Sequence, residues 1–337
     1  MASLTRAGVL TNYIEVAQHL GLNPHTMLRR VGLNKALIEQ PEQRIPTVAV
    51  VTLLEDSARE SGCMTFGLRM AESRQLSDFG AISLLLMHQP TLRDAIRTTV
   101  QYRHLLNEAL AIHVEEVDRK VIIREEVVTD SPMASRQAIE LAIGVMYRLC
   151  GALLGTHWRP YSVNFTHEAP QDLQLHRRLF RCHLGFGAEF NGIVCTATEL
   201  DEPNPLADPA LARFAQHYLD SLASAQERSV ALDVRKAVYL LLPMGRASIE
   251  QIAEALGMNV RTLQRRLQEH DETFSSLINS VRRELVMRYM ENEHYSMSQI
   301  ADLLGYSMPS SFTRWFAAQF GVAPARWRAS QATRNRR

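Results

Sequence analysis

The sequence has few cysteines, no long apolar run and almost no net charge. Four cysteines among 337 residues form no C-x-x-C pair, which excludes a disulfide framework and favours a reducing compartment. The best apolar stretch, residues 141–154, is interrupted by Arg148 and is shorter than the roughly 20 residues that a bilayer requires. The first ten residues carry only Arg6 as a charge and no long apolar segment, unlike a signal peptide. We therefore expect a cytoplasmic location and no membrane partner.

Catalytic signatures are missing as well. The chain contains no G-x-S-x-G, H-E-x-x-H or P-loop motif, and GFG at 185–187 continues as AEFNG, which is too weak for a dinucleotide site. Cys182 with His183 is the only close pair of metal-capable residues that involves a cysteine. We predict that the protein is not an enzyme, with no catalytic residue, no cofactor and no bound metal.

Length and local charge indicate two domains. A chain of 337 residues is more than twice an ordinary domain of roughly 150. From Val230 onward 15 Lys and Arg stand against 10 Asp and Glu, which leaves 22 against 26 for residues 1–229. Three prolines and three acids in DEPNPLADP, residues 201–209, mark a break. We predict an effector-sensing and dimerisation domain at 1–205, a linker region at 206–228, and a basic DNA-binding domain at 229–337.

The first domain has a mixed pattern that predicts an α+β fold. Helical periodicity dominates the first hundred residues, and period-two alternation begins at Ile112 and continues through 121–128 as a predicted hairpin. A helix is expected at 132–154, and further strands at 161–166 and 190–197. The second domain shows only helical patterns.

An internal repeat dominates that second domain. SIEQIAEALG at 248–257 and SMSQIADLLG at 296–305 match at a fixed offset of 48 residues. Each begins with a capping box, Ser248 with Gln251 or Ser296 with Gln299, and each ends at a glycine able to take a positive φ. The repeat therefore predicts a short helix and a tight turn, twice.

A second helix with an exposed polar face follows each turn. In the first, Leu263 and Leu267 are buried, and in the second Phe312 and Phe316 are buried. Helix, turn and cationic second helix make a helix-turn-helix, whose second helix enters the DNA major groove. A single glycine turn between amphipathic helices would indicate ordinary packing, but two capped copies favour DNA binding. The residues 274–291 between the copies predict a long helix that holds both recognition helices for a two-part DNA site.

Residues 248–328, which end in GVAPARWR, resemble the DNA-binding domain of the AraC/XylS family of bacterial transcriptional regulators. The resemblance rests on both helix-turn-helix units, on VRREL in the joining helix and on LLGYSMPSSFTRWFAAQFGVAP. It implies base contacts from Arg261, Gln264, Arg265, Ser310, Ser311 and Arg314. For the phosphate backbone and the first turns of the helices we expect contacts from Ser248, Asn259, Thr262, Ser307, Pro309, Thr313 and Arg282. There are two departures, Pro309 without a side-chain donor and Ala317 where the family often has lysine. They predict that the second unit reads bases more weakly or relies more on phosphates and DNA shape.

The first domain is similar to the arabinose-binding-like sensor domain of a large AraC-type subgroup. GLNPHTMLRRVGL, FGLRMAES, residues 79–106 and LGFGAEFNGIVC carry this similarity. It implies control by a small-molecule effector, frequent homodimerisation, and activation of transcription through contact with RNA polymerase at promoter DNA. It does not imply that the ligand is arabinose.

Several side chains were assigned to a candidate effector pocket by composition alone. Polar and aromatic groups among apolar walls predict a pocket lined by His88, Tyr102, His104, Tyr147 and Trp158, although core aromatics and satisfied histidines would give the same pattern. Residues 13–33 also resemble a small helix-turn-helix, with Arg29 and Arg30 in its second helix, but packing against the sensor body is the preferred interpretation.

Two alternative functions remain at this point. An architectural DNA-binding protein without an effector would share the helix-turn-helix units but lack sequence preference and ligand response. A regulator fused to alkyl-transfer DNA-repair chemistry would require a zinc-bound cysteine among clustered thiolates, which the spacing of Cys63, Cys150, Cys182 and Cys195 disfavours.

Overall fold

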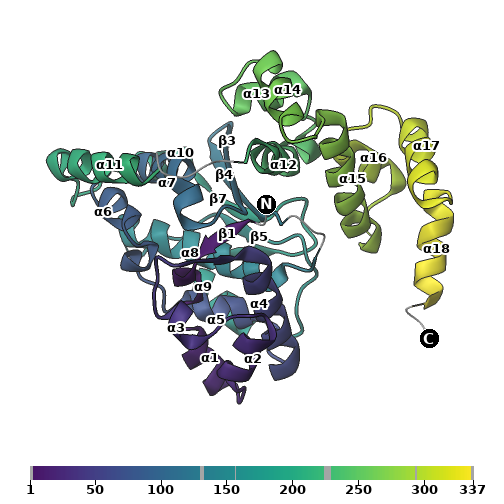
Figure 1. Cartoon of the computed structure of the whole chain (residues 1–337). Coiled ribbons are helices and arrows are strands. Elements are labelled where there is room, and N and C mark those ends of the chain that lie inside the picture. Colours follow the sequence, from purple (N-terminus) through teal and green to yellow (C-terminus); the bar gives the residue numbers. More distant parts are fainter. Residues whose placement is uncertain (1–2, 130–132, 156, 224–228, 293, 335–337) are drawn as a thin grey trace. The chain divides into compact units, whose positions relative to one another are not determined.

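The computed structural model describes residues 3–129, 133–155, 157–223, 229–292 and 294–334 (Figure 1). The chain divides into two compact units, Met1–Glu227 and Arg228–Arg337. Each unit has its own hydrophobic core, so each is described separately.

The first unit combines helices with two small sheets, as the α+β prediction requires. Its longer helices are α4 (Thr47–Ser61), α7 (Leu92–Leu106), α8 (Arg136–Leu154) and α11 (Pro209–Ala223). Its shorter helical segments are η1 (Ala7–Leu10), α1 (Tyr13–His19), α2 (Pro24–Arg30), α3 (Lys35–Ile38), α5 (Phe66–Glu72), η2 (Leu76–Phe79), α6 (Ile82–Met87), α9 (Gln174–Phe180) and α10 (Ala197–Leu200). Its strands are β1 (Leu4–Arg6), β2 (Arg44–Pro46), β3 (Leu110–Val117), β4 (Lys120–Val127), β5 (Ser162–Asn164), β6 (His183–Gly185) and β7 (Gly192–Thr196).

The larger sheet has the strand order β3-β4-β7-β5-β6. The predicted hairpin is confirmed as β3 and β4, in register from Leu110 opposite Val127 to Val117 opposite Lys120. The strands expected at 161–166 and 190–197 are confirmed as β5 and β7, which pair antiparallel. The short strands β1, β2 and β6 were not predicted, whereas β5, equally short, lies within an alternating pattern that continues over residues 161–166.

Helix α8 forms the centre of this unit, and the residues 130–132 just before it lie outside the described ones. It is long and apolar enough to cross a membrane by length and composition, yet most of its surface is buried inside the protein, as in the core helix of a globular domain. Helix α5 packs closely on α8 because Gly67 and Gly144 lie at the contact. A Cβ at Gly67 would lie 2.0 Å from the carbonyl oxygen of Gln137, so only glycine allows this approach.

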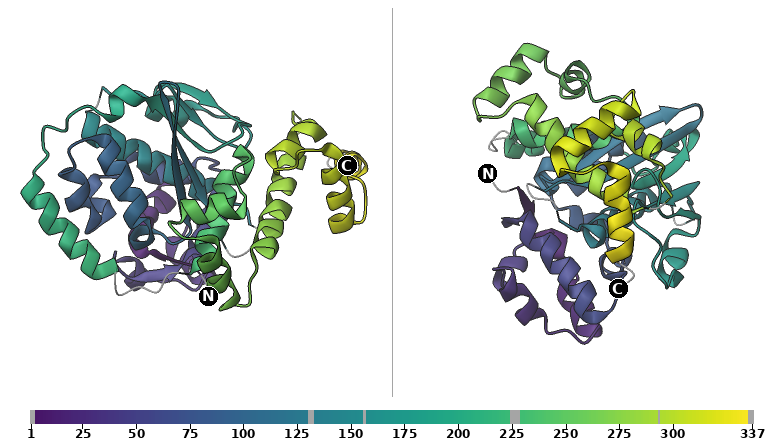
Figure 2. Two further views of the ribbon diagram at one scale, coloured as in Figure 1. Left: turned by 90° about the horizontal axis from the view of Figure 1, so that it is seen from above. Right: turned by 90° about the vertical axis from the view of Figure 1, so that its right-hand side faces the viewer.

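Helix α11 belongs to the first unit, although residues 206–228 were predicted to be a linker region. It packs on α6 and α7, and Figure 2 shows it on the outside of the unit. Two of the three prolines that indicated a linker precede the helix, and the third, Pro209, is its first residue, where a helix needs no backbone donor. Asp208 accepts bonds from the amides of Ala210 and Leu211 to start the helix. Residues 224–228 lie outside the described ones.

The segment 13–33 packs within the first unit. Its two helices, α1 and α2, join at Gly21 (φ 78°) and lie against α5 and α4. Met27 and Leu28 are buried, and Arg30 forms an ion pair with Glu60 on α4. The resemblance to a helix-turn-helix at this end therefore reflects core packing.

The second unit is entirely helical in its described part. It comprises α12 (Val230–Leu241), η3 (Leu242–Met244), α13 (Ile249–Ala255), α14 (Val260–Gln268), α15 (Phe274–Glu291), α16 (Met297–Leu303), α17 (Pro309–Phe320) and α18 (Pro324–Arg334). Figure 1 shows α15 between the α13–α14 pair and the α16–α17 pair.

Candidate DNA-binding interface

The first helix-turn-helix, α13 and α14, is built from local signals in its sequence. Ser248 and Gln251 form the predicted capping box, with N–O distances of 3.3 and 3.1 Å. Gly257 makes the turn at φ 65°, and the Asn259 side chain accepts a bond from the Thr262 amide at 2.8 Å to start α14. Nearby side chains therefore accept hydrogen bonds from backbone N–H groups at the start of α13 and of α14, which have no partner within the helix.

The second helix-turn-helix, α16 and α17, repeats this construction. Ser296 and Gln299 form the second capping box, with N–O distances of 3.2 and 2.9 Å. Gly305 takes φ 72°, and a Cβ there would lie 3.0 Å from Leu242, which packs against this turn. Pro309 stands in the first turn of α17, where a helix needs no backbone donor.

The surface of α14 is cationic, as predicted. Leu263 and Leu267 are buried, and the remaining residues of the helix face outward around them. The predicted base-contact residues Arg261, Gln264 and Arg265 are all exposed. Arg265 makes only a long contact with Glu269, at 3.7 Å between Nε and Oε1, which a DNA base can replace at little cost.

The surface of α17 carries less charge. Phe312 and Phe316 are buried, while Ser310 and Arg314 are exposed and Ser311 is half-buried. Among the residues expected near phosphates, those exposed are Ser248, Asn259, Ser307, Pro309 and Thr313, and Thr262 is half-buried. The contacts of these residues with DNA stay predictions.

Arg282 has a structural role on α15 that the sequence did not indicate. Its Nε donates to the carbonyl of Leu304 at 3.0 Å, and its guanidinium lies 4.5 Å from the ring centre of Tyr306. Arg282 therefore holds the turn between α16 and α17, which positions the second recognition helix.

A shared core joins the two helix-turn-helix modules. Helix α12 packs on α13, α14 and α15, while η3, which follows it directly, packs on α16. One apolar cluster accordingly contains residues of both modules, from Leu263 in the first to Phe316 in the second. The sequence assigned the joining role to α15 alone, so the contribution of α12 was missed.

A buried polar network fixes α12 to α15. Arg235 donates to the Ser280 hydroxyl at 3.0 Å and forms an ion pair with Glu284. Tyr239 donates its hydroxyl to the other oxygen of Glu284, and burial raises the pKa of that phenol well above its usual value. Arg235 and Tyr239 are four residues apart on one helix face, but their partner is 45 residues away from the nearer of them. No local pattern could have revealed the pairing.

Comparison with known proteins identifies this architecture. The family described as "Arabinose-binding domain of AraC transcription regulator, N-term" matches residues 21–204, more than half of the chain, and a "Helix-turn-helix domain" family matches residues 234–330. The chain belongs to the AraC family of transcription regulators. Its helix-turn-helix unit is therefore a DNA-binding unit, and its first unit is an arabinose-binding-like sensor domain.

Known AraC-type relatives span almost the whole chain. The HTH-type transcriptional regulator VirS of Mycobacterium tuberculosis is 31% identical over 331 residues, which cover 98% of this chain and 97% of VirS. The ornithine utilization regulator of Pseudomonas aeruginosa is 21% identical over 316 residues, covering 94% and 93%. The crystal structure of the transcriptional regulator CdpR from Pseudomonas aeruginosa matches 95% of this chain and 96% of its own, with a TM-score of 0.47 and 19% identity.

In the sensor domain of this AraC-type regulator, the five residues predicted to line an effector pocket fall into three places. Tyr102 stacks with His104, with ring centres 6.5 Å apart, and binds Asp220 of α11 through its hydroxyl. Tyr147 packs on Trp158, with ring centres 5.7 Å apart. His88 lies 3.1 Å from the carbonyl oxygen of Leu206. These contacts hold the sensor fold together and do not bring the five residues to one site.

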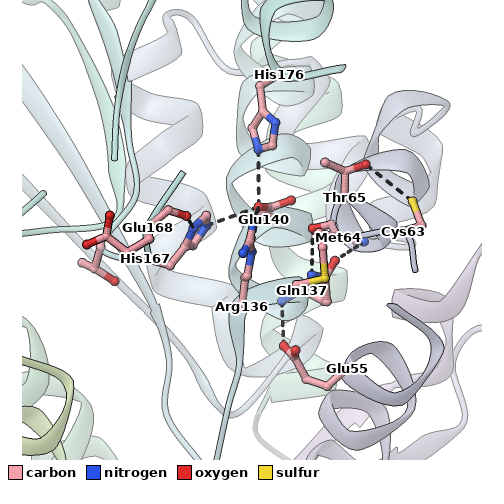
Figure 3. A network of polar contacts seen from close by, with 12 residues as sticks. Glu55, Cys63, Met64, Thr65, Arg136, Gln137, Glu140, His167, Glu168 and His176 are labelled. Carbon is pink, nitrogen blue, oxygen red and sulfur yellow. Dashed lines mark hydrogen bonds and ion pairs between the residues drawn. The ribbon is translucent and has the colours of Figure 1, made fainter. Parts of the chain in front are cut away.

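A buried carboxylate network connects the sensor helices (Figure 3). The Glu140 carboxylate on α8 lies 3.2 Å from His167 and 3.3 Å from His176 of α9. Burial alone would raise the pKa of Glu140, but the bonds from the two imidazoles outweigh it and hold that pKa at about 2. One turn away, Gln137 binds the Gly67 amide and the Met64 carbonyl, at 2.9 and 3.0 Å. The network therefore locks α8 to α5 and α9.

Three cysteines of the sensor domain, Cys150, Cys182 and Cys195, lie in surroundings that keep their thiols protonated. Burial raises the pKa of Cys150 well above its usual value, that of Cys182 to about 11 and that of Cys195 to about 12. Among the residues that the structure describes, no group of three or more His, Cys, Asp or Glu side chains could hold a metal ion.

Proposed function

We propose that this AraC-type regulator activates transcription in the cytoplasm by reading a two-part promoter site under the control of a small-molecule effector. The shared core of the two helix-turn-helix modules carries the proposal, because it places α14 and α17 in a fixed relation within one chain. Two recognition helices that are fixed relative to one another can enter successive major grooves about 34 Å apart on one face of DNA. Contact with RNA polymerase would then raise promoter activity.

Selection of bound sequences from random double-stranded DNA tests this proposal. The full chain is used at physiological salt, because salt suppresses the sequence-independent electrostatic attraction. We expect two enriched blocks about one helical turn apart. Binding without enrichment, fading steadily as salt rises, would instead support the architectural alternative.

Replacing Arg265 with alanine is expected to cost about 1 to 3 kcal/mol of binding free energy at a single base pair of the selected site. The exposed guanidinium can donate two bonds to a guanine edge, and alanine cannot. Competition binding with single-base variants of the site measures the effect. Arg266→Ala is the matched control, because this exposed arginine lies on the same helix about 100° further round and is expected to weaken all sequences alike. Unchanged base preference in Arg265→Ala would show that α14 is not the reading helix.

We also propose that the regulator is a homodimer through α11. The buried face of this helix carries Ala215 and Leu219 against the sensor body. Its outer face presents an apolar stripe at helical spacing, formed by Leu211, Phe214, Tyr218 and Leu222, all exposed. Phe214 keeps 75% of its surface exposed, and a contiguous apolar surface of this kind is typical of a protein interface. Two copies of the stripe could cover one another around a twofold axis.

The substitution Phe214→Asp is expected to convert a dimer into a monomer at micromolar concentration, because it would bury a charge in the proposed interface. Sedimentation equilibrium of the full chain measures the change. His217→Asp places the same charge on an exposed position of α11 outside the stripe and is expected to leave the dimer intact. A monomeric parent chain, or equal effects of both substitutions, would count against α11 as the interface.

A further inference from the structure

A pocket with a cavity volume of about 120 Å³, partly open to solvent, lies in the first unit between the helices and the large sheet. Helices α4 and α8 provide one side, and strands β3 and β4 provide the other. Most of its walls are aliphatic, with Val51, Leu54, Ile112, Leu141 and Met146 among them. Its volume is close to that of an engineered cavity of about 150 Å³ that binds benzene. A molecule of about ring size therefore fits its apolar part.

Three polar side chains of the cavity lining have atoms without a hydrogen-bond partner among the described residues. These atoms are Oε2 of Glu125, Nε of Arg74 and Oγ1 of Thr47, and all three residues are almost fully buried. A buried polar atom without a partner costs about 1 to 3 kcal/mol. Three such atoms on residues that line one apolar space leave hydrogen-bond positions that a bound molecule could fill.

The charges around the cavity are balanced without any ligand. Arg6 is held by the Glu42 carboxylate through two bonds of 2.6 and 2.8 Å. Burial lowers the pKa of Arg74 to about 10, so this guanidinium stays charged at neutral pH, and the Asp78 carboxylate nearby is its counter-charge. Glu125 has no cationic partner within the described part of the first unit, and burial raises its pKa to about 8, which leaves it mostly protonated. A charged ligand would therefore bring an uncompensated charge into the interior.

We propose that this cavity is the effector site and that it takes an uncharged, largely apolar molecule of about ring size that carries a hydroxyl or carbonyl oxygen. The inference rests on the proposed effector control and deepens it. An oxygen on the ligand would accept a bond from Arg74 or from protonated Glu125, while the ring would fill the aliphatic space. None of His88, Tyr102, His104, Tyr147 and Trp158 belongs to this lining. The effector residues are thus a different set from those that composition indicated.

Calorimetric titration of the full chain at neutral pH with two matched pairs of probes tests the proposal. Benzyl alcohol and benzamide are uncharged, whereas benzylamine and benzoate are their cationic and anionic counterparts. We expect the uncharged probes to bind about tenfold more tightly than the charged ones, because only the latter bring an unbalanced charge. Ala142→Leu, which fills the cavity from α8, should weaken their binding by about tenfold or more. Ala152→Leu is the control, since Ala152 is exposed on α8 and outside the lining.

Each result decides one point. Binding of the uncharged probes that is lost in Ala142→Leu and kept in Ala152→Leu supports the site. If Ala142→Leu does not fold, Thr47→Val removes one of the orphan hydroxyls with little change of shape and should still weaken binding. Absent binding, or binding that neither variant changes, would overturn the site, and preference for benzylamine or benzoate would overturn the ligand class. DNA selection on the same preparation separates the two proposals. Enriched DNA sequences without probe binding would refute only the proposed effector site. Probe binding without enriched DNA sequences would refute only the proposed sequence-specific regulation.

Discussion

Replacing Glu284 with alanine is expected to destabilise the DNA-binding unit by about 3 to 5 kcal/mol. Arg235 and Glu284 keep only 9% and 10% of their side-chain surface exposed, so the pair is shielded from solvent. Removing the carboxylate leaves the guanidinium buried without its counter-charge, and it also removes the acceptor of the Tyr239 hydroxyl. Since α12 and α15 join the two helix-turn-helix modules, this loss should loosen both recognition helices together.

Urea unfolding of the full chain measures this effect. Trp315 and Trp327 lie in the second unit, so their fluorescence in a Trp158→Phe background reports on that unit. Glu269→Ala is the control, because its long contact with Arg265 is exposed and should contribute at most about 1 kcal/mol. In the double variant Arg235→Met, Glu284→Leu, most of the stability should return, since apolar residues can replace a buried ion pair. Equal small losses in Glu284→Ala and Glu269→Ala would show that the network contributes no more than a surface pair.

The parts that could be predicted from sequence are those whose causes are local. The two capping boxes and the turns at Gly257 and Gly305 each depend on residues within four positions of one another. The buried stripes of α14 and α17 follow from helical spacing in the same way. The DNA-binding unit was therefore predictable almost element by element, and the hairpin of the sensor domain was predictable from alternation over eight-residue strands.

The parts that could not be predicted depend on residues that are distant in sequence. Arg235 meets Glu284, and Glu140 meets His176, only because the fold brings their helices together. The cavity could not be predicted for the same reason. Its lining residues Thr47, Arg74 and Glu125 belong to three segments that are distant in sequence, and their positions follow no regular spacing. Composition pointed instead to conspicuous aromatics and histidines such as Tyr102, which the structure uses for packing. Buried polar atoms that lack a hydrogen-bond partner produce no recognisable pattern in a sequence.

Replacing Glu125 with glutamine is expected to stabilise the sensor domain, and to do so increasingly as the pH rises. In the folded chain the pKa of Glu125 is about 8, above its ordinary value of 4.5, so the folded state retains a proton that the unfolded state releases. The parent chain therefore loses stability between about pH 4.5 and pH 8, and the loss is complete above that range. Glutamine keeps the shape and cannot ionise. The gain should be below about 1 kcal/mol at about pH 5 and on the order of 4 to 5 kcal/mol at about pH 9.

The fluorescence of Trp158 during urea unfolding, with Trp315 and Trp327 replaced by phenylalanine, measures this gain in the first unit. Glu140→Gln is the control, because this substitution is expected to lower the stability of the sensor domain instead of raising it. Because the folded pKa of Glu140 is about 2, its carboxylate stabilises the fold above about pH 4.5, and the variant should be less stable than the parent chain at both pH values. A Glu125→Gln gain that does not grow with pH would mean that Glu125 is ionised in the folded chain. The cavity would then carry a negative charge, and its ligand would have to be a cation.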